Sequence, residues 1–274
     1  MVTVHNFSYG LLTPVLGYLI SCLGCFLGLR CTSRARACQG ATKARWLALA
    51  AVAIGSTGVW AMHFIAMLGY TIPGQTIRYN VPITVLSMLI AVVVVGVGLF
   101  IVGFGGDGVT RLLIGGVIIG CGVASMHYMG MAAMRMPDNM HYNVPLVIVS
   151  VLIAVLAGTV ALLAALRLAG IRITLVASLI MGVAVSGMHY TGMAAMHLTP
   201  ATASMPGMLS GATATGVLLP LIIGISILAF GLAAVIGLSP SDEEIRAEDA
   251  LMRQLARGPR GAEEPAGRPT SSWW

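Results

Sequence analysis

The sequence predicts an all-α membrane protein with seven transmembrane helices, built from repeated helix pairs of about 63 residues. Three observations lead to this prediction. Hydrophobic residues make up 58% of the 274-residue chain and charged residues only 9%, whereas soluble domains carry about 25% charged residues. Seven apolar stretches reach the ~20 residues that a helix needs to cross a bilayer. Two of these stretches are near-copies of each other, which is typical of a repeated structural unit.

The seven spans are expected near residues 10–29, 46–68, 82–104, 110–133, 144–167, 172–196 and 215–238. Helices are the natural spanning form, because the bilayer offers no partner for unpaired backbone groups. The connections are short, so successive helices should pack antiparallel.

Cys22 and Cys25 of the first span are expected to serve packing rather than a redox reaction. Cys31 and Cys38 are expected in a basic loop that follows this span.

The distribution of positive charge predicts the orientation in the plasma (inner) membrane. Thirteen of the fifteen Lys and Arg residues fall in connections and a tail that would share one side, and only Arg78 and Arg135 fall on the other. Positive residues favour the cytoplasmic side, so the N-terminus is expected outside and the C-terminus in the cytoplasm. This role for the charge accounts for the net +6, and no nucleic-acid partner is expected.

The composition changes at residue 239. Residues 1–238 are expected to form the membrane domain, surrounded by membrane lipid, and 239–274 a short, partly disordered cytoplasmic tail. Ser241 and Glu244 have the spacing of a capping box, which indicates a short surface helix. The tail leaves no room for a soluble catalytic domain, so the chain is expected to have no enzymatic activity. A separate signalling partner is expected to bind through residues 241–257.

A histidine motif recurs three times along the chain. The segments are VWAMHFIAML, ASMHYMGMAAM and SGMHYTGMAAM, which place His63, His127 and His189 at a nearly constant interval. All three motifs fall at the ends of the even-numbered spans, which run in the same direction. The three histidines should therefore share one depth near the outer surface.

A second recurring segment begins the third and fifth spans. YNVPITVLSMLIAV starts at Tyr79, and YNVPLVIVSVLIAV starts at Tyr142, one repeat later. Asn80 and Asn143 are expected to cap the helices that follow, and Pro82 and Pro145 fit a first helical turn. The segment HNFSYGLL before the first span is interpreted as a diverged copy of the same lead-in.

The motif has the spacing of a ligand stripe, because residues i, i+4 and i+7 of a helix share a face. The principal candidate metal ligands are His63, Met67, His127, Met131, His189 and Met193. Additional candidates stand beside the histidines, at i+7 or beyond the helices: Met62, Met126, Met134, Met188, Met196, His141 and His197. The methionines directly before the histidines point about 100° away and are weaker candidates.

Copper is the metal that these residue types favour. Imidazole suits copper, iron, zinc and nickel, while thioether sulfur selects copper, above all Cu(I). Zinc usually draws on Cys, His and carboxylates, and the predicted spans contain no Asp or Glu. Packing competes as an explanation, because methionine is a common core filler. Packing alone gives no reason for a histidine at the same position of every helix pair.

The string Met188-His189-Tyr190-Thr191 resembles the MHYT domain, a bacterial membrane sensor family named for this motif. The resemblance covers about residues 5–238, with the seven-span plan and further copies at Met126-His127-Tyr128 and Met62-His63-Phe64. It implies a copper site near the outer face, built from motif histidines and methionines. It also implies a sensor for a diatomic gas such as oxygen, carbon monoxide or nitric oxide. Many relatives fuse this domain to cyclic-di-GMP enzymes, whereas this sequence continues only into the short tail.

Two other functions fit the same residues. A copper transporter would need further ligands toward the cytoplasm, for which the sequence offers Cys22 and Cys25. A haem-binding membrane protein or membrane enzyme is the other alternative, since His and Met also ligate haem iron. Haem is less favoured, because the chain lacks the Cys-x-x-Cys-His attachment signature.

Overall fold

The computed structural model describes residues 4–106, 108–168, 170–200, 211–238, 251–253 and 255. Within these residues, seven helices are long and apolar enough to cross a membrane. The predicted fold class is therefore confirmed, and the chain is a multi-pass membrane protein. The chain divides into two units, Met1–Ile236 and Gly237–Trp274.

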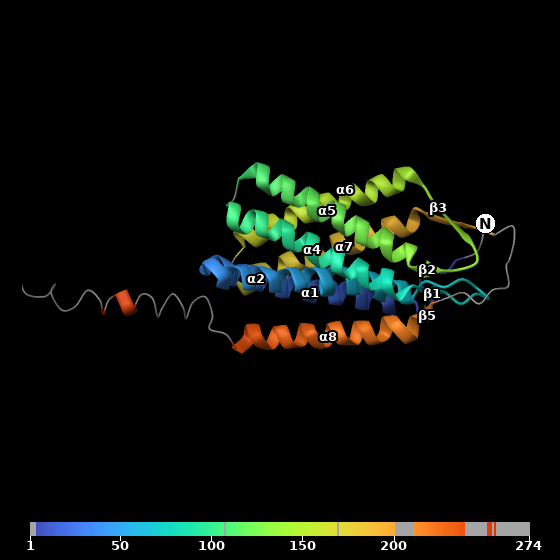
Figure 1. Ribbon diagram of the computed structural model, residues 1–274, viewed down its shortest axis with the longest axis horizontal. Coiled ribbons are helices and arrows are strands. Elements are labelled where there is room, and N and C mark those ends of the chain that lie inside the picture. Colours follow the sequence, from blue (N-terminus) through green and yellow to red (C-terminus); the bar gives the residue numbers. More distant parts are fainter. Residues whose placement is uncertain are drawn as a thin grey trace, which may run out of the picture. The chain divides into compact units, whose positions relative to one another are not determined.

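The second membrane span is continuous but changes character along its length, from α-helix to π-helix and back. The helices are α1 (Leu12–Ala37), α2 (Gly40–Val52), the π-helix η1 (Ala53–Ala61), α3 (Met62–Leu68), α4 (Val81–Gly105), α5 (Val109–Ala132), α6 (Val144–Arg167), α7 (Ile171–Ala194) and α8 (Ala214–Leu238). The strands are β1 (Arg78–Tyr79), β2 (Met134–Arg135), β3 (Asn139–Tyr142), β4 (Met196–Thr199) and β5 (Ala212–Thr213). Figure 1 shows the long helices side by side, with these strands gathered at one end.

Helix α1 corrects one part of the sequence prediction. It continues through Ala37, so Cys31 lies in the helix and only Cys38 in the connection. Arginines can stand in its last turns, because their guanidinium groups donate hydrogen bonds to backbone carbonyls near the ends of other helices. Arg34 donates from Nη2 to the carbonyl of Ile236 at 2.6 Å. Arg36 donates to carbonyls at the C-terminal end of α6.

The predicted caps of α4 and α6 are confirmed. The side chain of Asn80 accepts a hydrogen bond from the amide of Ile83, and that of Asn143 accepts one from Leu146. A proline occupies the first turn of each helix, where its missing N–H costs nothing. The repeated sequence thus produces the same local structure twice.

The starts of the first, third and fifth spans are each tied to the end of the span that follows by the same backbone bond. An amide before one helix donates to the carbonyl that ends the other. The pairs are Ser8 to Gly69, Asn80 to Ala133 and Asn143 to Ala195. The lead-in HNFSYGLL therefore makes the bond that the other two lead-ins make.

The first six spans pack in a closed order. Helix α1 packs against the second span, the second span against α4, α4 against α5, α5 against α6, α6 against α7, and α7 against α1. Three helix pairs thus close into a ring.

The orientation in the membrane stays a prediction. The two arginines expected outside, Arg78 and Arg135, lie on paired strands β1 and β2. Arg111, Arg167 and Arg172 lie at the opposite ends of α5, α6 and α7. Of the tail, the structure describes only residues 251–253 and 255, which are helical and exposed. The predicted capping box of Ser241 and Glu244 lies outside the described residues, as does the rest of segment 241–257 apart from those four.

Glycine allows α5 and α6 to approach closely, as small residues do between membrane helices. A Cβ atom at Gly120 would lie far inside van der Waals contact with the backbone of Val155 on α6. We expect Gly120→Ala to lower the free energy of unfolding by about 1–3 kcal/mol, because overpacking displaces backbone. Thermal unfolding in detergent measures this loss. Gly224→Ala on α8, where a Cβ would meet nothing within 4 Å, is the control, and equal stability of both variants would contradict the expectation.

Candidate metal centre

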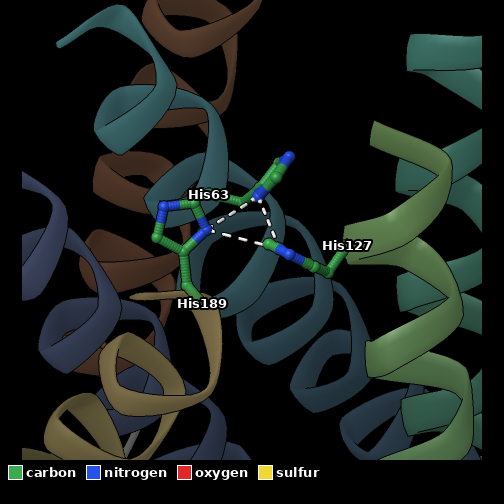
Figure 2. Close-up of side chains that lie close together, drawn as sticks. All are labelled: His63, His127 and His189. Carbon is green, nitrogen blue, oxygen red and sulfur yellow. Dashed lines mark hydrogen bonds between the residues drawn. The ribbon is translucent and has the colours of Figure 1, made fainter. Parts of the chain in front are cut away.

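Three buried histidines from three helices meet inside the ring. His63 lies on α3, His127 on α5 and His189 on α7, and each is at most 1% exposed. Their Nδ1 atoms are 3.0 Å apart for His63 and His189, 3.1 Å for His63 and His127, and 3.4 Å for His127 and His189. Figure 2 shows the three imidazoles pointing toward one another. The three nitrogens thus form a nearly equilateral triangle.

No choice of tautomers makes all three contacts of this triangle hydrogen bonds. In a neutral imidazole each ring nitrogen is either an N–H donor or a lone-pair acceptor. A hydrogen bond needs one donor and one acceptor, and three atoms in mutual contact have only these two roles to share. At least two Nδ1 atoms must therefore face each other with like roles. An unsatisfied buried polar group costs about 1–3 kcal/mol.

A cation accepts all three lone pairs and removes the conflict. The point in the plane of the three Nδ1 atoms that is equidistant from them lies roughly 1.8 Å from each, and bonds from a metal to imidazole nitrogen measure about 2.0–2.1 Å. A small outward relaxation of the rings would reach that length. Within the described residues, these histidines form the one group of His, Cys, Asp or Glu side chains with metal-binding proximity. The residues present therefore fit a metal ion.

The outward-facing nitrogens pack on glycines that the sequence reasoning missed. Among the described residues, Nε2 of His63 and Nε2 of His127 are buried without a hydrogen-bond partner. A Cβ atom at Gly130 of α5 would lie 2.5 Å from Nε2 of His63. A Cβ at Gly192 of α7 would approach Nε2 of His127 even more closely. The available signal was a glycine three residues after the histidine in two copies, where the first copy has Ala66.

The residue after each histidine is aromatic and stands edge-on to it. Ring centroids lie 4.6 Å apart for His63 and Phe64, 4.9 Å for His127 and Tyr128, and 4.8 Å for His189 and Tyr190. Edge-to-face geometry is the favoured arrangement of neighbouring aromatic rings. These contacts help fix the orientation of the imidazoles.

Two equivalent serines hold this aromatic layer in place. The hydroxyl of Ser150 on α6 bonds the hydroxyl of Tyr128 at 2.6 Å. Ser87, at the same position of the preceding copy on α4, instead accepts from the indole N–H of Trp60 at 3.1 Å. The first copy has Phe64 in place of a tyrosine, so the serine takes a different donor. The repeat keeps the anchor although the aromatic partner changes.

The methionines divide into groups. Met67, Met131 and Met193 are buried and follow the histidines by one helical turn. The helical i+7 spacing does not extend to Met134 and Met196, because α5 ends at Ala132 and α7 at Ala194. These two methionines lie in strands β2 and β4, which corrects the face assigned to them from the sequence.

The methionines before the histidines are buried but face other surroundings. A Cβ at Gly17 of α1 would lie 3.6 Å from Cγ of Met62, so Met62 packs toward α1. Met126 is fully buried. Met188 lines an apolar cavity between the helices. This agrees with the direction expected from helical geometry.

His141 and His197 lie elsewhere. They sit directly opposite each other in the ladder of β3 and β4, and both are exposed. Neither belongs to the buried histidine group. Near them, burial raises the pKa of Tyr142, and burial raises the pKa of Tyr70 to about 12. These phenols stay protonated at neutral pH, so they are not anionic ligands.

A cavity of about 40 Å³ adjoins the histidine layer. Val59, Val123 and Val185 line it, and each precedes one of the three histidines by four residues. The remaining lining comes from α1, η1, α4, α5, α6 and α7 and is also apolar: Cys25, Ile54, Val95, Ile119, Ala154, Ala157, Gly158, Ala161, Met181, Ala184 and Met188. The three-fold repeat thus places the cavity one helical turn from the imidazoles.

Known proteins share the repeat. The family model described as bacterial signalling protein N-terminal repeat, MHYT, matches residues 57–115, 120–178 and 182–247. The bifunctional diguanylate cyclase/cyclic di-GMP phosphodiesterase MucR of Pseudomonas aeruginosa is 35% identical over 92% of the chain and 37% of its own length. The cyclic di-GMP phosphodiesterase NbdA of the same organism is 37% identical over 72% of the chain and 25% of its own length.

A more distant relative is signaling protein YkoW of Bacillus subtilis, 31% identical over 69% of the chain and 24% of its own length. The chain therefore spans only between about a quarter and just over a third of the length of these curated relatives. No solved structure matches the chain.

Proposed function

Because the chain belongs to the MHYT family of bacterial signalling proteins, we propose that it is a membrane sensor that holds copper between His63, His127 and His189. The observation that carries the proposal is the triangle of Nδ1 atoms, whose three close contacts cannot all be hydrogen bonds. A membrane signalling role follows from the family.

The surroundings of the triangle favour copper over zinc. The group contains no carboxylate or thiolate among the described residues, and buried methionines follow one turn beyond the histidines. Thioether is a soft ligand that selects copper. Burial excludes water from the imidazoles, and the aromatic neighbours hold their rings. When bound, copper supplies an open coordination position for a diatomic gas such as oxygen, carbon monoxide or nitric oxide.

Metal analysis tests this proposal. Protein purified in detergent and reconstituted anaerobically with Cu(I) is expected to retain about one copper per chain, because the chain supplies one set of three imidazoles. The variant His63→Asn/His127→Asn/His189→Asn is expected to retain none. A matched control, His141→Asn/His197→Asn, removes the exposed pair and should load like the wild type. Equal loading of wild type and triple variant, or stable loading with zinc but not copper, would overturn the copper assignment.

The output of the sensor is proposed to lie in a separate protein. The relatives named as cyclic-di-GMP enzymes align with this chain over 37% and 25% of their lengths. We propose no catalytic activity for the chain itself, and a signalling partner bound through the tail, 239–274. Co-purification with and without the tail tests the partner, and binding that survives removal of the tail would contradict that route.

Copper transport is a second candidate function. The observation that favours it is a set of sulfur atoms in the cavity beyond the histidine layer, from Cys25, Met181 and Met188. Such soft ligands suit Cu(I) and would continue a path across the membrane. Cellular copper that stays unchanged on deletion and on overexpression of the gene would count against transport and leave sensing.

A further inference from the structure

The cavity is lined by every span of the ring that the three helix pairs form. Val59, Val123 and Val185 come from the three histidine-bearing spans and occupy equivalent positions, four residues before each histidine. Four residues of α-helix rise about 6 Å, so Val123 on α5 and Val185 on α7 lie in the layer next to the imidazoles. Val59, in the π-helix η1, lines the same cavity. One valine from each copy at the same place makes the cavity a product of the repeat rather than an isolated packing gap.

The chemistry of the lining decides what the cavity takes. Its side chains are those of valine, isoleucine, alanine and methionine, with a single thiol from Cys25. A water molecule needs two to four polar partners, and apolar cavities stay dry and bind apolar molecules such as xenon. A charged ion is disfavoured, because an unpaired charge in an apolar medium is costly. The lining therefore selects an uncharged apolar occupant.

Size narrows the class of occupant. A single water requires roughly 10–15 Å³ of probe-occupied volume, and the cavity offers about 40 Å³. That space fits a molecule of two or three heavy atoms. Small side chains leave this room on α6 and α7: Ala154, Ala157, Gly158, Ala161 and Ala184. Larger residues at these positions would fill it.

We propose that this cavity is a binding site for an apolar diatomic gas, which it holds one helical turn from the histidine centre. Its part in sensing rests on the proposed function, whereas gas binding by the cavity does not require a metal. A gas dissolved in the bilayer would enter an apolar chamber before it reaches the imidazoles. The cavity would thus supply the centre from the lipid phase rather than from water.

Xenon is the probe for this site. In purified protein with ¹³C-labelled valine methyl groups, the signals of Val59, Val123 and Val185 are expected to shift saturably with xenon pressure. Ala154→Leu adds three carbon atoms to the lining and should abolish the shift. Ala184→Leu is a second filling variant in case the first does not fold. Ala234→Leu, on an exposed position of α8, is the matched control and should shift like the wild type.

The metal-free triple histidine variant separates this inference from the proposed function. Its valine signals are expected to respond to xenon as in the wild type, even if copper binding is absent in both proteins. The gas site is overturned if the valine signals of the wild type do not respond to xenon. It is also overturned if the signals of both filled variants respond as those of the wild type do. Cu(I) that displaces xenon from the valines would also overturn it, because the cavity would then be part of a copper path.

Discussion

Replacement of His127 by phenylalanine is expected to abolish copper binding and, at the same time, to leave the metal-free protein at least as stable as the wild type. The first effect follows from the loss of one of three ligands. The second follows from the triangle, because two remaining Nδ1 atoms, 3.0 Å apart in His63 and His189, can take one donor and one acceptor role. The substitution also removes the buried Nε2 of His127, which has no partner among the described residues.

The two effects are measured in one thermal unfolding experiment, with and without Cu(I). Copper at 100 times its dissociation constant stabilises a protein by about 2.7 kcal/mol, so the wild type should shift upward and His127→Phe should not. Without metal, relief of the conflict is worth about 1–3 kcal/mol, which offsets the cost of repacking. His141→Phe, at an exposed position, should keep the copper shift. A metal-free His127→Phe protein much less stable than the wild type would show that the triangle is already satisfied.

Gly130→Ala is expected to weaken copper binding about 10- to 100-fold, the range found when residues that orient metal ligands are changed. The new Cβ would lie 2.5 Å from Nε2 of His63. A buried imidazole between packed helices has little room to retreat, so the ring must turn and carry its Nδ1 away from the other two. Gly192→Ala should act in the same way on His127, since its Cβ meets that ring.

Gly187→Ala is the matched control for both glycine variants. Gly187 lies on α7 two residues before His189, and a Cβ there meets nothing within 4 Å. Copper affinity should be unchanged, and stability should stay equal or rise by up to about 1 kcal/mol, since alanine favours helix over glycine. Copper titration of the three variants distinguishes the positions. An affinity of Gly130→Ala equal to that of Gly187→Ala would mean that the imidazole has free space.

The sequence predicted the features that depend on local pattern. Apolar length located the seven spans, and the repeated YNVP segment located the caps made by Asn80 and Asn143. The period of the histidines placed His63, His127 and His189 at one depth, and the structure brings their rings together. Each of these features depends on spacing along one helix or on equivalence between copies, which a single sequence records.

Other features depend on contacts between helices, which spacing does not encode. The glycines at Gly130 and Gly192 looked like ordinary packing residues, because the ring that needs their space belongs to a different helix in each case. The sequence predicts too short an α1, because the partners of Arg34 and Arg36 are carbonyls far away in sequence. The π-helix η1 carries no distinctive residue pattern.

The closed ring of three helix pairs has a consequence for how the centre can arise. Each copy contributes a single imidazole, and one imidazole neither conflicts with a neighbour nor holds a metal. An unlinked helix pair would form the centre only as a symmetric trimer, and dilution in the membrane would take it apart. Covalent linkage replaces that encounter by a high effective concentration within one chain. It also frees each copy to diverge, as the pairing of Ser87 with Trp60 and of Ser150 with Tyr128 illustrates.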